Sequence, residues 1–160
     1  MSQPEQRELH RRWGVELNNG TWDLLERVTP DSPQADRERV LYGAYASCYH
    51  WLQAGTPANH GRGEHLIASA ALAVGLPEVA LRHARRYAEL IDAHPEVMED
   101  WDRAFAAEAL ARALAGTGDL AAARAELARA EELTAKVTEP EDRQVLLDRL
   151  AKQPWYGLRG

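Results

Sequence analysis

The chain has 160 residues, a formal net charge of −6 and a single cysteine, Cys48. This length is typical of one domain, and we expect residues 1–160 to form a single one. One cysteine excludes an intrachain disulfide and any zinc site built from several cysteines. The negative charge disfavours direct binding to nucleic acid, because phosphate groups would be repelled.

The N-terminal stretch Met1–Glu8 is polar and lacks the apolar segment of an export signal. No window approaches the roughly 18 uninterrupted apolar residues that a membrane helix needs. We therefore expect a cytoplasmic protein that does not contact membranes.

Residues that favour helix starts and helix ends predict about eight helices. Proline beside a hydroxyl residue marks helix starts at Ser32-Pro33, Thr56-Pro57 and Thr138–Pro140, since the first helical turn tolerates proline. Stops are expected at Asn18–Gly20, Gly55, Gly75 and Gly116–Gly118. In chain order, the expected helices cover 4–18, 21–28, 33–54, 57–74, 77–93, 97–116, 119–137 and 140–152.

Apolar residues between these marks recur every three or four positions, as on one face of a helix. Ala80, Ala84, Tyr87 and Ile91 form one such series. No segment alternates with a period of two, so the sequence predicts an all-α fold. Alanine recurs densely from 104 to 130, and small side chains of this kind favour two closely packed antiparallel helices.

Two segments of the chain align with each other around Gly75 and Gly118. Each has a helix, a glycine turn and a second helix with an early alanine, Ala80 or Ala123. This order resembles the tetratricopeptide repeat, although the glycines lie 118 − 75 = 43 positions apart, against about 34 in the regular repeat. The chain also resembles a group of bacterial helical-repeat proteins without an assigned activity. The resemblance implies a short α-solenoid of stacked antiparallel helix hairpins.

A solenoid of this kind must be capped at both ends. We expect the N-terminal helix within 1–20, with Trp13, to cap one end. Residues 140–160 would close the other end with a helix and an aromatic tail that contains Trp155 and Tyr156. The tail is expected to fold back onto the last hairpin, and the alternative is that it docks onto a partner.

In tetratricopeptide-like folds, the first helix of each pair lines the concave surface. Aligning this chain with the family places six residues on that groove: Arg62, His65, Ser69, Phe105, Glu108 and Arg112. Two arginines in a groove can clamp a carboxylate, such as the C-terminus of a peptide, by paired hydrogen bonds. The alternative is that Arg112 pairs internally with Glu108, four residues earlier on the same helix face.

Histidines suggest a second candidate site. His60 and Glu64 share a helix face, His65 lies about 100° away, and His50 ends the preceding helix. These residue types suit zinc or another divalent metal. No HExxH motif accompanies them, and no nucleophile or phosphate-binding motif occurs elsewhere. We therefore expect no catalytic residues, no resident metal and no cofactor.

The helix over 33–54 is rich in aromatic residues: Tyr42, Tyr45, Tyr49 and Trp51. These rings cannot all face one core, so some should lie at the surface or in a homodimer contact, or pack on the N-terminal helix. Cys48 shares a helical spacing with Leu41, Tyr45 and Leu52, which predicts a small core residue rather than a nucleophile.

The sequence therefore favours a non-enzymatic module that binds a protein, a peptide or a second copy of itself. The alternative function is a small-molecule or metal-binding helical protein centred on His50, His60, Glu64 and His65. A third hypothesis is an accessory domain acting beside a DNA-binding partner, which would have to supply the DNA contact.

Overall fold

The computed structural model describes residues 1–159, and within them the chain contains helices and no strand. Seven α-helices and one short 3-10 helix follow one another in this order: α1 (Gln3–Leu25), α2 (Gln34–Ala54), α3 (Pro57–Ala73), α4 (Pro77–Ala93), η1 (Pro95–Val97), α5 (Asp100–Thr117), α6 (Leu120–Ala135) and α7 (Pro140–Ala151). In this described part, none of the helices combines the length and the apolar character needed to cross a membrane.

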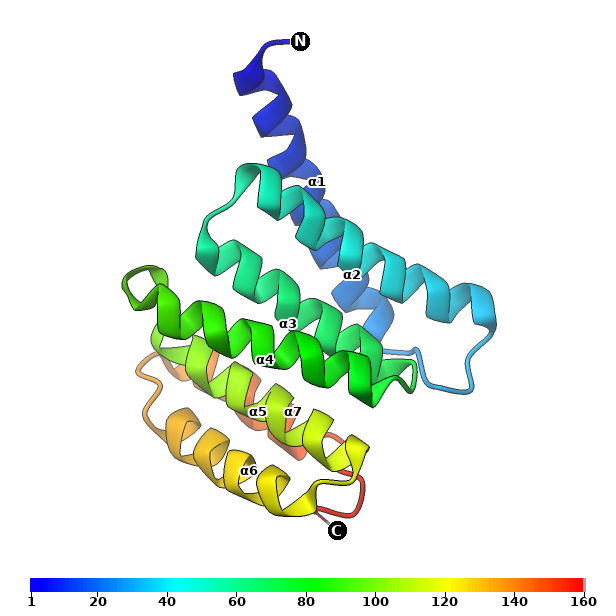
Figure 1. Cartoon of the computed structure of the whole chain (residues 1–160), viewed down its shortest axis with the longest axis vertical. Coiled ribbons are helices and arrows are strands. Elements are labelled where there is room, and N and C mark those ends of the chain that lie inside the picture. Colours follow the sequence, from blue (N-terminus) through cyan, green and yellow to red (C-terminus); the bar gives the residue numbers. More distant parts are fainter. Residues whose placement is uncertain (160) are drawn as a thin grey trace.

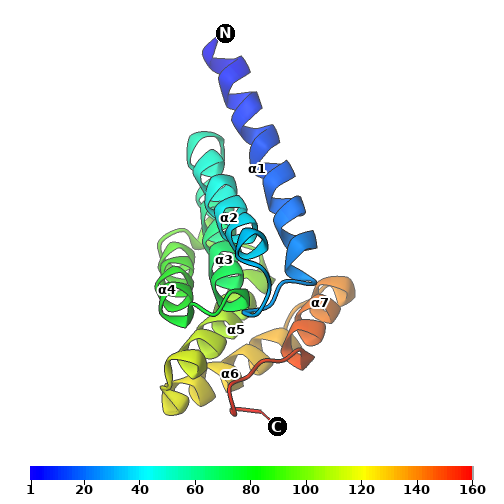
Figure 2. The same ribbon diagram turned by 90° about the vertical axis from the view of Figure 1, so that its right-hand side faces the viewer.

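Consecutive helices lie side by side, from α1 against α2 through α5 against α6 (Figure 1). The odd-numbered helices also contact one another, α1 with α3, α3 with α5 and α5 with α7. These four helices therefore form one layer, while α2, α4 and α6 lie outside it. The N-terminal part of α1 extends beyond the rest of the molecule in both views (Figures 1 and 2).

Alanine makes up much of the core between α3, α4 and α5. The buried residues there are Ala68, Ala71, Ala80, Ala84, Ala109 and Ala113, each at most 2% exposed. Small side chains let helix backbones approach closely. The close packing expected from the alanine-rich segment therefore extends to α3 and α4.

The expected break at Asn18–Gly20 is wrong, because α1 continues through it to Leu25. The helix packs against α2 on both sides of the expected break. A Cβ at Gly14 would lie 2.9 Å from the Trp51 ring, and Thr21 packs directly against Gly43. Gly20 is exposed and touches nothing, so its weak helix propensity is outweighed by this packing.

The helix expected from 97 begins instead at Asp100, after the separate turn η1. The backbone N–H of Glu99, the residue before α5, donates to the Asp102 carboxylate at 2.8 Å, which helps to set the start. Thr138 does not cap α7, since its N–H and hydroxyl both donate to the Asp100 carboxylate at 2.9 Å. Its neighbour Glu139 occupies the capping position.

The aromatic tail returns to the helices, as expected. Trp155 is 1% exposed, and its indole N–H donates to the Leu150 carbonyl at 3.0 Å. The Arg112 guanidinium lies over its ring at 3.9 Å. Trp13 of α1, in contrast, remains 43% exposed.

Candidate functional site

A groove of about 1340 Å³ runs along the layer of odd-numbered helices. Its walls come mainly from α1, the loop that follows it, α3, α5, α7 and the C-terminal tail, elements far apart in sequence, with Trp51 of α2 and Tyr87 of α4 also contributing. The side chains most relevant to binding are Trp22, Arg62, His65, Ser69, Phe105 and Arg149. Aromatic rings and arginines therefore share the lining with aliphatic residues and with two acidic ones, Glu26 and Asp148.

The groove positions expected from the family resemblance fall on this feature with one exception. Arg62, His65, Ser69, Phe105 and Arg112 all line the groove. Glu108 does not, because it is 0% exposed and lies beneath the groove surface in an ion pair. Trp22 and Arg149 were missed, since they come from α1 and α7, which lie outside the two aligned repeats.

His65 is the most unusual polar residue of the groove. Its ring packs among Trp22, Tyr87 and Phe105, with ring centroids 5.2–5.7 Å away. The residue is only 6% exposed, and its Nε2 is buried without a hydrogen-bond partner. Burial, together with the positive charge of Arg149, lowers the pKa of His65 from 6.5 to about 3. The imidazole is therefore neutral at physiological pH.

Arg62 is held in position by Asp102 and Trp101. Its Nε and Nη2 donate to both oxygens of Asp102, at 3.1 and 2.9 Å, and its guanidinium lies 4.4 Å from the Trp101 ring centre. The Tyr87 hydroxyl also donates to Asp102, and burial followed by this carboxylate raises the pKa of Tyr87. Asp102 is wholly buried, whereas a third of the Arg62 side chain is exposed. The Arg62 guanidinium is therefore accessible from the groove, whereas the Asp102 carboxylate that balances its charge is not.

Arg112 does not have the clamping role proposed for it. Its Nε donates to Glu108 at 2.5 Å, and its two Nη atoms donate to the carbonyls of Arg149, Lys152 and Pro154. The internal pairing of Arg112 with Glu108, the alternative left open by the sequence, is the one observed. Arg112 thus holds the tail in place, and Arg149 is the second arginine whose side chain keeps some exposure, at 22%.

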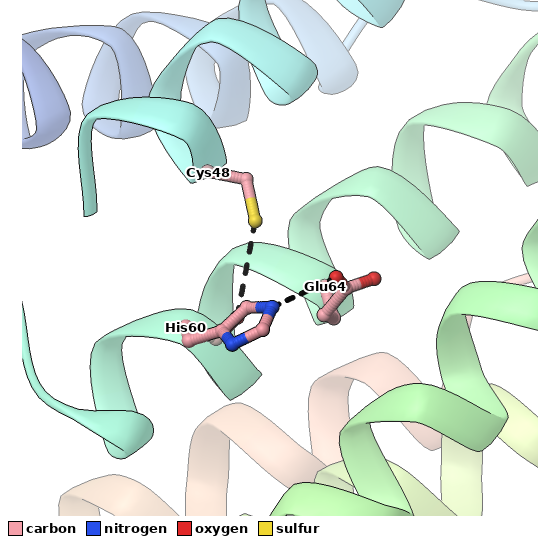
Figure 3. A group of neighbouring side chains, drawn as sticks. All are labelled: Cys48, His60 and Glu64. Carbon is pink, nitrogen blue, oxygen red and sulfur yellow. Dashed lines mark hydrogen bonds and ion pairs between the residues drawn. The ribbon is translucent and has the colours of Figure 1, made fainter. Parts of the chain in front are cut away.

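A second polar cluster lies where α2, α3 and α4 meet (Figure 3). His60 Nε2 lies 3.1 Å from one Glu64 oxygen, and His83 Nδ1 lies 2.5 Å from the other. Cys48 faces this pair from α2, and its sulfur and the ligand atoms of His60 and Glu64 all lie within 4.8 Å of one another. The Tyr45 hydroxyl contacts His83 Nε2 at 3.0 Å. Apart from His60 and Glu64, these neighbours were not identified from the sequence.

Titration in this cluster is governed by burial and by opposite charge. Burial alone would raise the pKa of Glu64, but hydrogen bonds and attraction from His83 and His60 lower it overall. Burial, followed by the charge of Glu64, raises the pKa of the Cys48 thiol to about 12. The thiol is therefore protonated at neutral pH and is not an activated nucleophile.

The structure does not bring together the four residues of the alternative site. His50 contacts His10 of α1, Nδ1 to Nδ1, at 2.8 Å, and His65 points into the aromatic groove. Only His60 and Glu64 remain neighbours. His83 comes from the next helix, and although the sequence indicated that these two helices pair, it did not indicate which residues of α4 would face Glu64.

Cys48 is a buried core residue, as expected, but the predicted stripe around it is wrong. The buried face of α2 contains Val40, Ala44 and Cys48, whereas Tyr45 and Leu52 are 39% and 56% exposed. The expected stripe was therefore rotated away from the true core face.

Tyrosines on α2 leave an exposed aromatic surface. Tyr42 and Tyr49 are 62% and 56% exposed, as expected for some rings of this helix. Homodimerisation through this face stays a prediction.

We compared the chain with known proteins by sequence and by structure. No family model, no curated protein and no solved structure matches it.

Proposed function

We propose that the chain is a short tetratricopeptide-like solenoid whose groove binds a peptide that ends in a carboxylate. The layer of odd-numbered helices supports this, because the first helix of each pair lines the concave surface in such folds. The same four helices line the groove here. No catalytic group is required by this function, and we propose that the protein is not an enzyme.

The exposed arginines above buried carboxylates are the observation that carries the proposal. Arg62 and Arg149 reach the groove surface, while their partners Asp102 and Glu108 are wholly buried. A ligand in the groove therefore meets two guanidinium groups whose positions are already fixed. Preorganised guanidinium groups are well suited to bind a carboxylate, since little side-chain entropy is lost on binding.

The apolar lining of the groove indicates which residues should precede the C-terminal carboxylate of the bound peptide. The rings of Trp22, Trp101 and Phe105 line the groove, and aromatic rings bind apolar and aromatic side chains. Binding sites commonly combine such a lining with a few fixed polar groups. A peptide with apolar residues before its C-terminus fits both features.

A peptide binding assay can test this function. Short peptides with free C-termini would be screened by fluorescence polarisation, and the tightest binder would be remade as its C-terminal amide. We expect the amide to bind at least about tenfold more weakly, because a hydrogen bond between charged groups contributes about 1.5–3 kcal/mol.

Two variants locate the binding. Arg62→Gln should weaken binding by a similar factor, and Ser69→Phe should block the groove without removing a charge. Arg82→Gln is the matched control, because Arg82 is an exposed arginine of α4 outside the groove. Equal binding of the acid and the amide, or equal loss in the Arg82 variant, would contradict the proposal.

A further inference from the structure

The cluster of Cys48, His60 and Glu64 lies outside the groove and is not needed for peptide binding. None of the three lines the groove, although the neighbouring residues Asn59, Arg62 and Gly63 do. The two features therefore occupy different sides of α3. Any role of the cluster is independent of the peptide-binding proposal.

Cys48 reaches this cluster because the opposite position on α3 is a glycine. A Cβ at Gly63 would lie 2.8 Å from Cys48 Sγ and 3.1 Å from its Cβ, closer than side chains tolerate. The contact that Sγ makes with the His60 carbonyl is long, at 4.0 Å. The thiol is thus held beside the two other side chains and is only weakly hydrogen-bonded.

Glu64 is oriented by residues of two further helices. His83 on α4 holds its Oε2 at 2.5 Å, and Tyr45 on α2 in turn contacts His83. The other oxygen, Oε1, faces His60. Outer residues that orient a ligating side chain in this way are a regular feature of metal sites.

The spacing of the three donor atoms approaches that of a zinc site. Zinc bonds of about 2.0–2.3 Å in a tetrahedron place ligand atoms roughly 3.3–3.8 Å apart. Here the nitrogen and oxygen are 3.1 Å apart, and all three donors lie within 4.8 Å. A small inward movement of Sγ completes the geometry. The His60 side chain is 21% exposed, which gives an ion a way in.

The geometry points to a binding site for one Zn²⁺ formed by Cys48, His60 and Glu64, with His83 and Tyr45 as outer residues. Thiolate, imidazole and carboxylate are the three ligand types that zinc combines in proteins. Three protein ligands leave the fourth position for a water molecule. When zinc binds, Cys48 releases its thiol proton to solvent, and His60 uses the Nε2 lone pair with its proton on Nδ1.

Metal titration of the full-length protein tests this site. The protein, stripped with chelator and dialysed, would be titrated with Co²⁺ and with Zn²⁺. We expect native mass spectrometry to show one Zn²⁺ per chain, and cobalt to give the near-ultraviolet absorption band of a thiolate ligand. Folded wild-type protein that takes up cobalt without this band, or takes up neither metal, would overturn the proposal.

Variants assign the ligands. Cys48→Ser should abolish the thiolate band and His60→Gln should weaken zinc binding at least about 100-fold, while thermal unfolding without metal verifies that each is folded. His83→Gln should keep the band and weaken binding by roughly 10–100-fold, as expected for an outer residue. His10→Gln is the matched control, because His10 belongs to the other histidine pair. Zinc binding lost in His10→Gln but kept in His60→Gln would overturn the proposal.

The proposal of a zinc site and the proposal of a peptide groove can be refuted separately. Arg62→Gln should retain its zinc, and Cys48→Ser should retain any peptide binding. Loss of one activity therefore leaves the other proposal standing.

Discussion

Two sets of buried polar groups, one around Glu108 and one formed by Cys48 and His65, differ in how fully they are already bonded. In the C-terminal half, Glu108 is enclosed by Arg112 and Arg149, and Arg112 also binds three carbonyl groups of α7 and the tail. In the N-terminal half, Cys48 makes one long contact, and the Nε2 of His65 makes none. The first set is already paired within the fold, whereas the second leaves donor and acceptor atoms for a ligand.

This difference implies that a substitution should cost most at Glu108 and less at a group that lacks a partner, such as His65. A buried ion pair contributes little net stability when intact, yet removing one partner is costly because the other charge remains buried. Groups that lack partners can be replaced with much smaller losses. Three substitutions test this gradient.

The largest effect is expected at Glu108. Glu108→Gln removes the charge that compensates the largely buried guanidinium of Arg112 and the partly exposed one of Arg149, and we expect it to lower the free energy of unfolding by about 3–5 kcal/mol. Urea unfolding followed by circular dichroism measures the change. Glu132→Gln is the matched control, since Glu132 also pairs four residues along its helix, with Lys136, but both side chains are 67% exposed. That variant should change stability by less than about 1 kcal/mol. Equal losses of stability in Glu108→Gln and Glu132→Gln would contradict the prediction that the buried ion pair is the more costly one to break.

An intermediate effect, dependent on pH, is expected at His65. Because folding lowers its pKa from 6.5 to about 3, the folded state favours the neutral imidazole. The resulting stability is complete above pH 6.5 and is lost as the pH falls towards 3. Between pH 7 and pH 5 the loss amounts to about 2 kcal/mol.

The variant His65→Gln isolates this contribution. Its free energy of unfolding should fall by about 2 kcal/mol less than that of the wild type between pH 7 and pH 5, in urea titrations at each pH. Glu108 does not interfere in this range. Burial opposes its ionisation, but Arg149 and Arg112 lower its pKa from 4.5 to about 2. Its own contribution is therefore lost only below about pH 4.5. If the free energy of unfolding changed with pH equally in wild type and variant, the pKa of His65 would not be lowered by folding, and the prediction would be wrong.

Much of the fold could be predicted because helix periodicity is a local signal. The expected ranges 57–74 and 77–93 agree with α3 and α4 to within one residue. The groove positions on α3 and α5 followed from the resemblance, since a helix face is set once its register is known. Glu108 was misplaced because it depends on Arg149, which arrives from α7, 41 residues further along the chain.

The candidate metal site also shows that contacts between distant parts of the chain are harder to predict than contacts within one helix. His60 and Glu64 are four residues apart on one helix, so their proximity is visible in the sequence. Cys48 and His83 join them only through the packing of α3 against α2 and α4. The sequence indicated that neighbouring helices pair, but which side chains face each other depends on their fit across the whole interface, which no local pattern records. His50 was nearer in sequence but lies on another face of α2, against α1.

The smallest effect is expected at Gly20, where the sequence indicated a stop and the structure shows a continuous helix. Gly20 is exposed, and a Cβ there would meet nothing within 4 Å. Gly20→Ala should therefore stabilise the protein by about 0.5–1 kcal/mol, because alanine loses less backbone entropy in a helix. Urea unfolding with an unchanged denaturant dependence measures this.

Gly14→Ala is the matched control in the same helix, and it should destabilise, since its Cβ would lie 2.9 Å from the Trp51 ring. If α1 ended near residue 18 and Gly20 occupied a left-handed turn, alanine at Gly20 would destabilise as well. The sign of the change at Gly20 thus decides whether packing of α1 on α2 overrides the local stop signal, and with it whether Trp22 reaches the groove as part of a continuous helix.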